Sequence, residues 1–295
     1  MGGYNASPGE REASINLAGQ GYSRTSIGNP RRLAPLRRLE TRLLDLTIFS
    51  RTMHNPQCLA ETHLRADQVM LRIKICGITS TADARAAVEA GADAIGLNFY
   101  RGSKRYVTPE KAQDIVSDLA ASVAKVGVFV NSSVSEVNQI AQSVGLDWVQ
   151  LHGDEPPEFL SQVSSEKHIL RVYRLESSEL TPVTTDLAAC QVSGRMPDAI
   201  LVDSVVPGEY GGTGKKGSVI HFKRDRIRSQ DLLFSMPVLL AGGLTPENVG
   251  EAIRDSCPEG VDVASGVESS PGVKDPELVK RFVAEAQYAL EQLKR

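Results

Sequence analysis

The sequence predicts an α/β protein whose main part is a single domain, a (β/α)8 or TIM barrel, over residues 70–295. Three observations favour this fold. Short apolar strands alternate with amphipathic helices from Met70 onward, which is typical of parallel strands covered by helices. Eight strand signals occur, and the 226 residues from 70 to 295 are close to the usual length of such a barrel. A doubly wound open sheet has the same alternation, but the Gly-x-Gly-x-x-Gly of a dinucleotide-binding sheet does not follow the first strand.

The first four βα units are indicated by apolar strands followed by helix-start residues. The first strand, "LRIKI", alternates apolar and basic residues. The helix after it is expected to end at Gly91, and the next helix to carry Pro109 in its first turn. The expected strands are 71–75, 93–99, 125–130 and 148–151, and the expected helices are 81–91, 108–123, 133–145 and 156–165.

The second four units are less regular. A poorly defined helix follows the fifth strand, and a long irregular stretch follows the sixth strand until about residue 235. The helix after the seventh strand has Pro246 just inside its expected start. The expected strands are 168–175, 198–203, 236–243 and 260–265, and the expected helices after the last two strands are 245–256 and 275–294.

Composition and charge argue against several classes of protein. The hydrophobic content of 41% and the charged content of 23% are typical of a soluble globular protein. A formal net charge of -3 does not indicate the basic surface that binds nucleic acid. No apolar run approaches the roughly 20 residues needed to cross a bilayer. The four cysteines lie far apart without metal-ligand spacing, so we expect no metal site and a cytoplasmic, reducing compartment.

Residues 1–69 differ in composition from the rest of the chain. They contain nine Arg, no Lys and six acidic residues, and the acidic residues argue against a transit peptide. We predict a non-catalytic extension, for which two interpretations are open. It is either a disordered tail with one short amphipathic helix, or the result of a start assigned too early, because Met70 stands directly before the first strand.

The carboxyl ends of the strands are where such a barrel carries its active site, and the loops after strands 7 and 8 commonly hold phosphate. Both of these loops contain glycine, which lets backbone N–H groups approach an anion closely. We therefore predict phosphate binding at Gly243, Ser265 and Gly266. At the same edge, Cys76 ends the first strand and Asp203 ends the sixth, so a thiol and a carboxylate are expected in one site.

Each of these side chains also has a purely structural interpretation. Cys76 could be a small buried apolar residue at the end of its strand, and Asp203 could cap a loop. His152, which follows the fourth strand, could be a structural histidine. The shared placement of Cys76 and Asp203 at the mouth where the phosphate loops converge favours the functional interpretation for these two residues. For His152 the structural interpretation is preferred.

The chain resembles the phosphoribosylanthranilate isomerase family of tryptophan biosynthesis from about residue 71 to residue 285. Three departures from the family pattern are Ala264 in place of Ser, a longer basic segment at 215–228, and the fifth-strand segment "RVYRLE". The motifs that carry the resemblance occur in the family's order: "KICGIT", "DAIGLNFYRGSKRYV", "VGVFVN", "VQLHGDE", "ILVDS…PGEYGGTG", "LLAGGLTPENV" and "VDVASGVESSPGVKD".

The resemblance implies an Amadori rearrangement of N-(5-phosphoribosyl)anthranilate to 1-(2-carboxyphenylamino)-1-deoxyribulose 5-phosphate, without metal or cofactor. It implies that Cys76 is the base and Asp203 the acid, that Arg105 binds the anthranilate carboxylate, and that Gly212 lies in a loop closing over substrate. The expected partner is thus this small phosphorylated sugar–anthranilate, with neither nucleic acid nor membrane, and the chain is expected to be a monomer or a weak homodimer.

A base at Cys76 must be a thiolate, whereas a free thiol with a pKa of about 8.5 is only about 3% ionised at pH 7. Nearby backbone amides or a helix N-terminus can lower this pKa, and the sequence permits such an environment around Cys76 without showing it.

Three rival functions remain open at this level. An aminoaldose isomerase using two aspartates would need an acidic residue where Cys76 stands, and an indole-forming synthase would need lysines at strand ends, whereas Lys74 lies inside a strand. The third rival is a non-catalytic barrel that uses its basic extension and residues 215–228 as interaction surfaces.

Overall fold

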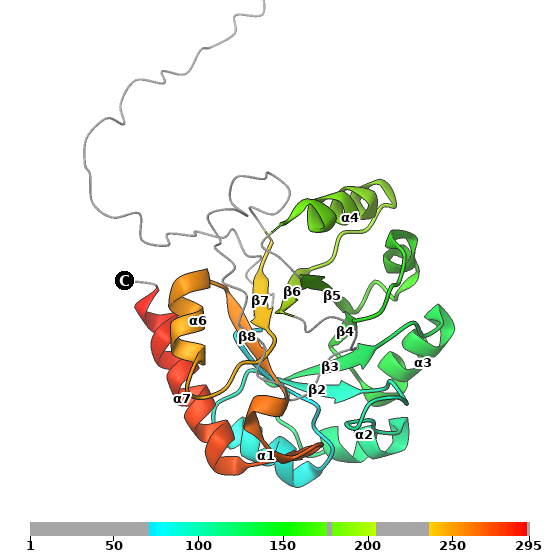
Figure 1. Cartoon of the computed structure of the whole chain (residues 1–295). Coiled ribbons are helices and arrows are strands. Elements are labelled where there is room, and N and C mark those ends of the chain that lie inside the picture. Colours follow the sequence, from blue (N-terminus) through cyan, green and yellow to red (C-terminus); the bar gives the residue numbers. More distant parts are fainter. Residues whose placement is uncertain (1–70, 176–178, 205–235, 294–295) are drawn as a thin grey trace, which may run out of the picture. The chain divides into compact units, whose positions relative to one another are not determined.

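The computed structural model describes residues 71–175, 179–204 and 236–293. A closed barrel of eight strands lies at the centre, and the helices surround it (Figure 1). Every strand pairs in parallel with its neighbours in chain order, and β1 closes the barrel against β8. The predicted (β/α)8 barrel is confirmed.

The strands lie close to their predicted positions, with ends that differ by at most two residues. They are β1 Ile73–Cys76, β2 Ala94–Asn98, β3 Ala124–Phe129, β4 Trp148–Leu151, β5 His168–Leu175, β6 Ala199–Ser204, β7 Val238–Ala241 and β8 Gly260–Val263. A short antiparallel pair, β9 Glu268–Ser270 and β10 Val273–Lys274, follows β8 and was not predicted.

The helices show larger differences from the prediction. They are α1 Thr81–Glu89, α2 Pro109–Val116, α3 Val134–Val144, η1 Pro157–Gln162, α4 Thr181–Val192, α6 Val249–Ser256, η2 Ser265–Val267 and α7 Pro276–Gln292. Side chains of Ser80, Thr108, Ser133 and Asp275 cap α1, α2, α3 and α7 by accepting backbone N–H groups of the first turn.

Three helix predictions were wrong in detail. The segment 156–165 forms the 3-10 helix η1 rather than an α-helix, because two successive prolines hold its start extended and remove backbone donors. Helix α2 ends at Val116 instead of running on to residue 123. Pro246 lies in a turn before α6, whose first residue is Val249. Gly91 does follow α1 with a positive φ of 98°, as the stop signal predicted.

Helix α4 is better formed than its sequence indicated. Its buried residues, Val183, Leu187 and Cys190, recur at helical spacing. A polar cluster adds to this packing, since Nε and Nη2 of Arg171 on β5 donate to Asp186 of α4 over 2.6 and 2.7 Å. The unusual "RVYRLE" segment therefore supplies a partner for α4.

The interior of the barrel changes from apolar to polar toward the carboxyl ends of the strands. On β4, Trp148 packs in the apolar interior and Gln150, two residues later on the same face, lines a pocket. On β6, Leu201 and Asp203 show the same change. The apolar layer consists of Leu71, Ala94, Ala124, Val126, Trp148, Leu170, Val172, Ala199, Leu201, Leu239 and Ala241.

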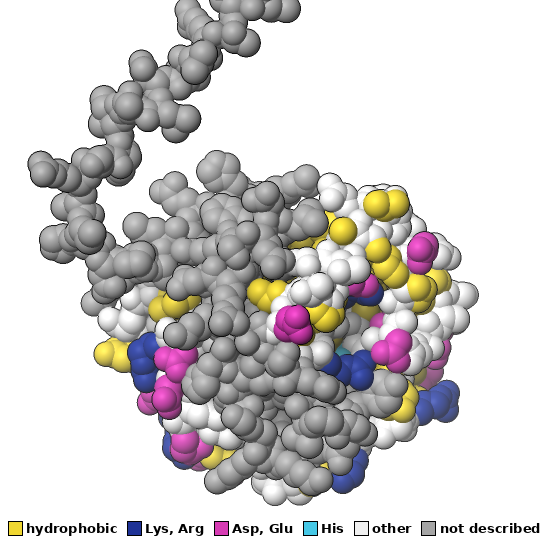
Figure 2. Space-filling view, turned by 45° about the horizontal axis from the view of Figure 1, so that its top comes forward, with side chains coloured by type: hydrophobic (Ala, Val, Ile, Leu, Met, Phe, Trp, Pro, Cys, Tyr) yellow, Lys and Arg dark blue, Asp and Glu magenta, His cyan; other side chains and the backbone are white. Residues whose placement is uncertain are grey.

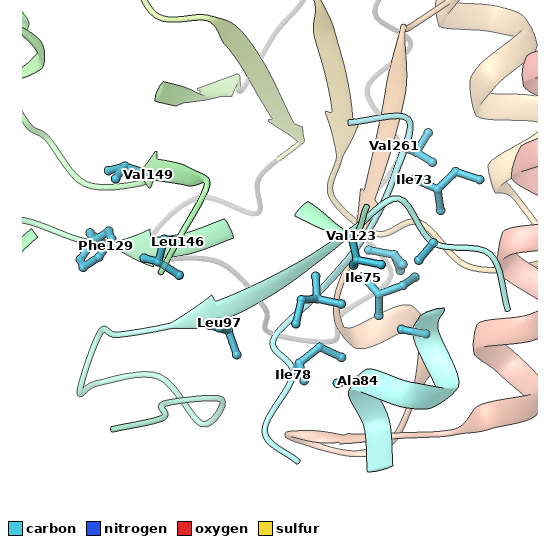
Figure 3. Packing of buried hydrophobic residues seen from close by; sticks show 14 of the residues in the cluster. Ile73, Ile75, Ile78, Ala84, Leu97, Val123, Phe129, Leu146, Val149 and Val261 are labelled. Atoms are coloured by element: carbon cyan, nitrogen blue, oxygen red, sulfur yellow. The ribbon is translucent and has the colours of Figure 1, made fainter. Parts of the chain in front are cut away.

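The opposite faces of the strands pack against the helices. Figure 3 shows part of this outer core, with Ile73 of β1 beside Val261 of β8 and with Ala84 of α1 near Ile78. Each of these side chains is at most 2% exposed. Because both faces of β1 are buried, the strand is fixed in place, and so is the residue at its end.

The helices of the described residues are at most 17 residues long, and one face of the molecule carries charges of both signs. Within these residues, no helix is long and apolar enough to cross a membrane. On the face shown in Figure 2, acidic and basic side chains of the described residues are interspersed with apolar and neutral ones.

Candidate active site

A pocket lies at the carboxyl ends of the strands, where the sequence predicted the site. It holds ≈ 840 Å³ of empty space, part of which is open solvent. The described residues lining it include six of the predicted site residues, namely Cys76, Arg105, Asp203, Gly243, Ser265 and Gly266. Gly212 and the basic segment 215–228 lie outside the described residues.

Cys76 is held at the end of β1 by its neighbours on β2. Residues Cys76 and Gly96 are partners in the strand register. A Cβ atom on Gly96 would lie 2.6 Å from Sγ of Cys76, so only glycine leaves room for the thiol there. Sequence reasoning missed Gly96, although a glycine inside an apolar strand is a signal of close approach.

The electrostatic surroundings of Cys76 disfavour its thiolate form. Burial raises the pKa of the Cys76 thiol above its usual value, and Asp262 acts in the same direction. Lys74 and Lys274 oppose this rise but do not overcome it. The sequence left the direction of this shift open, because it depends on Lys74, Asp262 and Lys274, which come together only in the fold.

Beneath Cys76 lies a buried ion pair between neighbouring strands. Nζ of Lys74 on β1 donates to Oδ1 of Asp262 on β8 over 2.7 Å. Lys74 is fully buried and Asp262 is 8% exposed. Burial opposes the charge on Lys74, but Asp262 and Cys76 together outweigh it and raise the pKa of Lys74 above its usual value. Sequence reasoning noted Lys74 only as a lysine within a strand and gave no role to Asp262.

Asp203 reaches the pocket from β6, beside two polar residues of the β4 end. Its Oδ2 lies 3.5 Å from Nε2 of His152, and Nδ1 of His152 lies 3.5 Å from Nε2 of Gln150. All three side chains line the pocket. The structure thus brings His152, which sequence reasoning preferred as a structural histidine, next to the predicted acid.

Arg105 enters the pocket from the loop after β2 and is already paired. Its Nε and Nη2 donate to Oε1 and Oε2 of Glu268 over 2.7 and 2.6 Å. Nζ of Lys274 donates to the same carboxylate over 2.9 Å. The stem of Arg105 crosses Gly77, where a Cβ atom would collide with it, and Gly77 has a positive φ of 75° that favours glycine.

The loops after β7 and β8 touch each other. Gly242 and Gly243 have positive φ angles of 92° and 64°, so the chain turns through two successive left-handed residues. A Cβ atom on Gly266 would collide with the carbonyl oxygen of Leu244, which shows how closely the two loops approach. The side chain of Asn248 stabilises the loop after β7 by donating a hydrogen bond of 3.0 Å to the carbonyl oxygen of Gly243.

These contacts bring chemically different groups into one pocket. Its lining includes residues of the two glycine-containing loops and Arg105. The thiol of Cys76 and the carboxylate of Asp203 line the same pocket. Among the described residues, no three His, Cys, Asp or Glu side chains are grouped so that they could hold a metal ion.

The same region of the chain matches known proteins. Residues 73–285 match the family described as N-(5'phosphoribosyl)anthranilate (PRA) isomerase. The N-(5'-phosphoribosyl)anthranilate isomerase of Geobacter sulfurreducens is 45% identical over 219 residues, which are 74% of this chain and 99% of that protein. The Trichlorobacter lovleyi protein of that name is 43% identical over 222 residues, which are 75% of this chain and 100% of the relative. The fold is also similar to the crystal structure of phosphoribosyl anthranilate isomerase from Thermotoga maritima, with a TM-score of 0.62 and 38% sequence identity. This match covers 74% of this chain and 100% of the Thermotoga maritima chain.

Proposed function

Because the chain belongs to the N-(5'-phosphoribosyl)anthranilate isomerase family, we propose that Cys76 is the base and Asp203 the acid of its reaction. The family reaction is the Amadori rearrangement of N-(5-phosphoribosyl)anthranilate to 1-(2-carboxyphenylamino)-1-deoxyribulose 5-phosphate, an aldose–ketose isomerisation in tryptophan biosynthesis. The observation that carries the residue assignment is that the two groups line one pocket from β1 and β6.

The first step opens the sugar ring. Asp203 donates its proton to the furanose ring oxygen, the bond from this oxygen to C1′ breaks, and the nitrogen lone pair forms the C1′=N bond of an iminium ion. In the second step the thiolate of Cys76 removes the proton from C2′, and the C–H electron pair forms the C1′=C2′ bond of an enolamine. The enolamine then tautomerises to the ketone. These are proton transfers, so we propose that the reaction needs no metal and no cofactor.

After one turnover the two groups have exchanged protonation states, because Asp203 has lost a proton and Cys76 has gained one. Both must be reset before the next substrate reacts. His152 lies next to Asp203 in the pocket and is the described imidazole nearest to this step. We include it in the proposal as the group through which a proton returns to Asp203.

We propose that the phosphate of the substrate binds the backbone amides of Gly243, Ser265 and Gly266. Support comes from the contact between the two loops and from the glycine conformations in the first one. A solved phosphoribosyl anthranilate isomerase, 35% identical with a TM-score of 0.59, holds reduced 1-(o-carboxyphenylamino)-1-deoxyribulose 5-phosphate. A ligand of this kind has an anionic group at each end, and the pocket offers the glycine-containing loops for one and Arg105 for the other.

At the other end, we propose that Arg105 receives the anthranilate carboxylate. Arginine offers parallel N–H donors to a carboxylate, whereas lysine offers only a point charge. The surroundings of Arg105 support this role, since Glu268 fixes the plane of the guanidinium in the pocket wall. We further propose a cytoplasmic protein that acts as a monomer or weak homodimer.

The experiment that tests this function follows the consumption of fluorescent phosphoribosylanthranilate by the purified full-length protein. We expect the wild-type protein to be active in the presence of EDTA. We expect Cys76→Ala to reduce this activity at least about a hundredfold. Full activity of Cys76→Ala would remove the proposed base. Loss of activity on chelation would contradict the metal-free proposal.

A further inference from the structure

Lys74 is a fully buried charge that the reaction described above does not use. It lies two residues before Cys76 on β1, so both side chains point to the interior of the barrel. Its ammonium group is paired with Asp262, its register partner on β8, over 2.7 Å. A buried ion pair is often no more stabilising than apolar residues of the same volume, so stability alone is weak grounds for this pair.

Each cation near Cys76 has a carboxylate partner. Lys274 of β10 donates to Glu268 and to the carbonyl oxygen of Ala264, and Arg105 donates to Glu268. Lys74 differs from both because it lies on the same strand and face as the thiol, and it opposes the rise in the pKa of Cys76 more than Lys274 does. The opposing carboxylate near the thiol is that of Asp262.

We propose that Lys74 is a positioning residue that stabilises the thiolate of Cys76 from inside the barrel while Asp262 keeps Lys74 protonated. The inference rests on the proposed role of Cys76 as the base. An isolated buried lysine tends to lose its proton, and the carboxylate of Asp262 prevents this loss. When the thiolate takes the C2′ proton, Lys74 keeps all of its own protons, so it acts only through its charge.

The test measures the ionisation of Cys76 directly in the free protein. Alkylation of the peptide containing Cys76 by iodoacetamide is followed by mass spectrometry from about pH 7 to about pH 11, a range that extends well above the ordinary pKa of a thiol because burial raises that of Cys76. In Lys74→Met the midpoint should move up by about one pH unit, which leaves about tenfold less thiolate below the midpoint. The kcat/KM at neutral pH should fall about tenfold and recover as the pH rises, with little change in KM.

A matched control removes another strand lysine with an aspartate partner. Lys125 on β3 lies 3.0 Å from Asp147 and does not line the pocket. Lys125→Met should therefore leave both the alkylation midpoint and the pH profile of activity unchanged. An equal shift in Lys125→Met and Lys74→Met would overturn the inference, because it would show a general effect of losing a lysine.

A second variant covers the case in which Lys74→Met fails to fold with Asp262 left unpaired. The double variant Lys74→Met/Asp262→Leu replaces the whole pair with apolar residues, a change that folded proteins often tolerate. Its midpoint should also move up, though less, because the attraction by Lys74 exceeds the repulsion by Asp262. An unchanged midpoint in either variant overturns the inference. A shifted midpoint with an unshifted activity profile would overturn the role of Cys76 as the base and leave its link to Lys74 standing.

Discussion

Arg105 and Glu268 are joined by two parallel hydrogen bonds of 2.7 and 2.6 Å, and their side chains are 8% and 4% exposed. Lys274 extends this contact, since its Nζ donates to Glu268 and to the carbonyl oxygen of Ala264, each over 2.9 Å. Ala264 directly precedes the loop proposed to bind phosphate. Glu268 therefore connects the residue proposed for the anthranilate carboxylate with the phosphate end of the pocket.

Replacing Arg105 by lysine should weaken substrate binding with little effect on kcat. Lysine loses both the planar contact with the substrate carboxylate and the paired contact with Glu268. A charged hydrogen-bonded contact contributes about 1.5–3 kcal/mol, so KM should rise about ten- to a hundredfold. Steady-state kinetics check this result, with Lys104→Ala as the control because Lys104 is exposed and should matter little. Unchanged kinetics in Arg105→Lys would leave the carboxylate without its proposed partner.

The pairing of Glu268 should make stability depend on pH in the acid range. Burial opposes the charge of Glu268, but hydrogen bonds from Arg105 and the charge of Lys274 outweigh it and lower the pKa of that carboxyl. Because the pKa of Glu268 is lower in the folded protein, its contribution to the free energy of unfolding is complete above the pKa of about 4.3 in the unfolded chain. This contribution is lost as the pH falls through the pKa of Glu268 in the folded protein.

Glu268→Gln removes the titrating carboxyl group. Comparing this variant with wild type therefore measures how much that group contributes to the pH dependence of stability. Urea unfolding at several pH values should show the largest loss of stability relative to wild type at neutral pH, and a shrinking difference as the pH falls below about 4. A difference that stays constant with pH would mean that the charge of Glu268 does not stabilise the fold.

The proposed acid and base should be needed for turnover and not for binding. Cys76→Ala and Asp203→Asn should each lower kcat by about a hundredfold or more, the usual scale for such groups. Substrate binding should change little, because the phosphate and carboxylate contacts remain. Rapid-mixing fluorescence separates the two quantities, and Cys190→Ala serves as a thiol control outside the pocket. Wild-type turnover in either variant would refute the assignment of that residue.

Gly96 should be intolerant of even one added methyl group. In Gly96→Ala the Cβ atom would lie 2.6 Å from Sγ of Cys76, so the thiol must move and kcat should fall about tenfold or more. Gly250→Ala is the matched control, because its Cβ would meet the flexible ends of two side chains, Arg254 at 3.3 Å and Glu285 at 3.9 Å. Equal kcat values for Gly96→Ala and wild type would show that the thiol has more room than the structure indicates.

A protein that begins at Met70 should fold and keep full activity. All the described residues that line the pocket lie between Cys76 and Gly266, and the family match covers residues 73–285. Thermal unfolding and the fluorescence assay compare this shortened protein with the full chain. A melting temperature lower by several degrees, or a loss of activity, would show that residues 1–69 contribute to the barrel.

Much of the architecture could be predicted because it is encoded locally. Each strand is a short apolar run, and each capped helix carries Ser, Thr or Asp at its start. Since parallel strands of a barrel end at one edge, the placement of Cys76, Asp203 and the two glycine-containing loops in one pocket followed from their positions along the strands.

The supporting contacts could not be predicted in the same way. They depend on which residues face each other across strands and loops that are distant in the sequence. Lys74 and Asp262 are 188 residues apart, and Arg105 and Glu268 are 163 residues apart. Helix η1 was mispredicted for a local reason, because its apolar spacing is helical but its two prolines favour a tighter, shorter turn.

The pairing of β1 with β8 also has a consequence for how the chain folds. The helices and neighbouring strands form from contacts close in sequence, whereas the first and last strands meet only after nearly the whole domain has been gathered together. Closing so long a segment is entropically unfavourable and slow. The Lys74–Asp262 pair joins β1 to β8, so the final surroundings of Cys76 form only when the barrel closes. A nascent chain that lacks β8 therefore has the thiol but not the electrostatic environment in which it works.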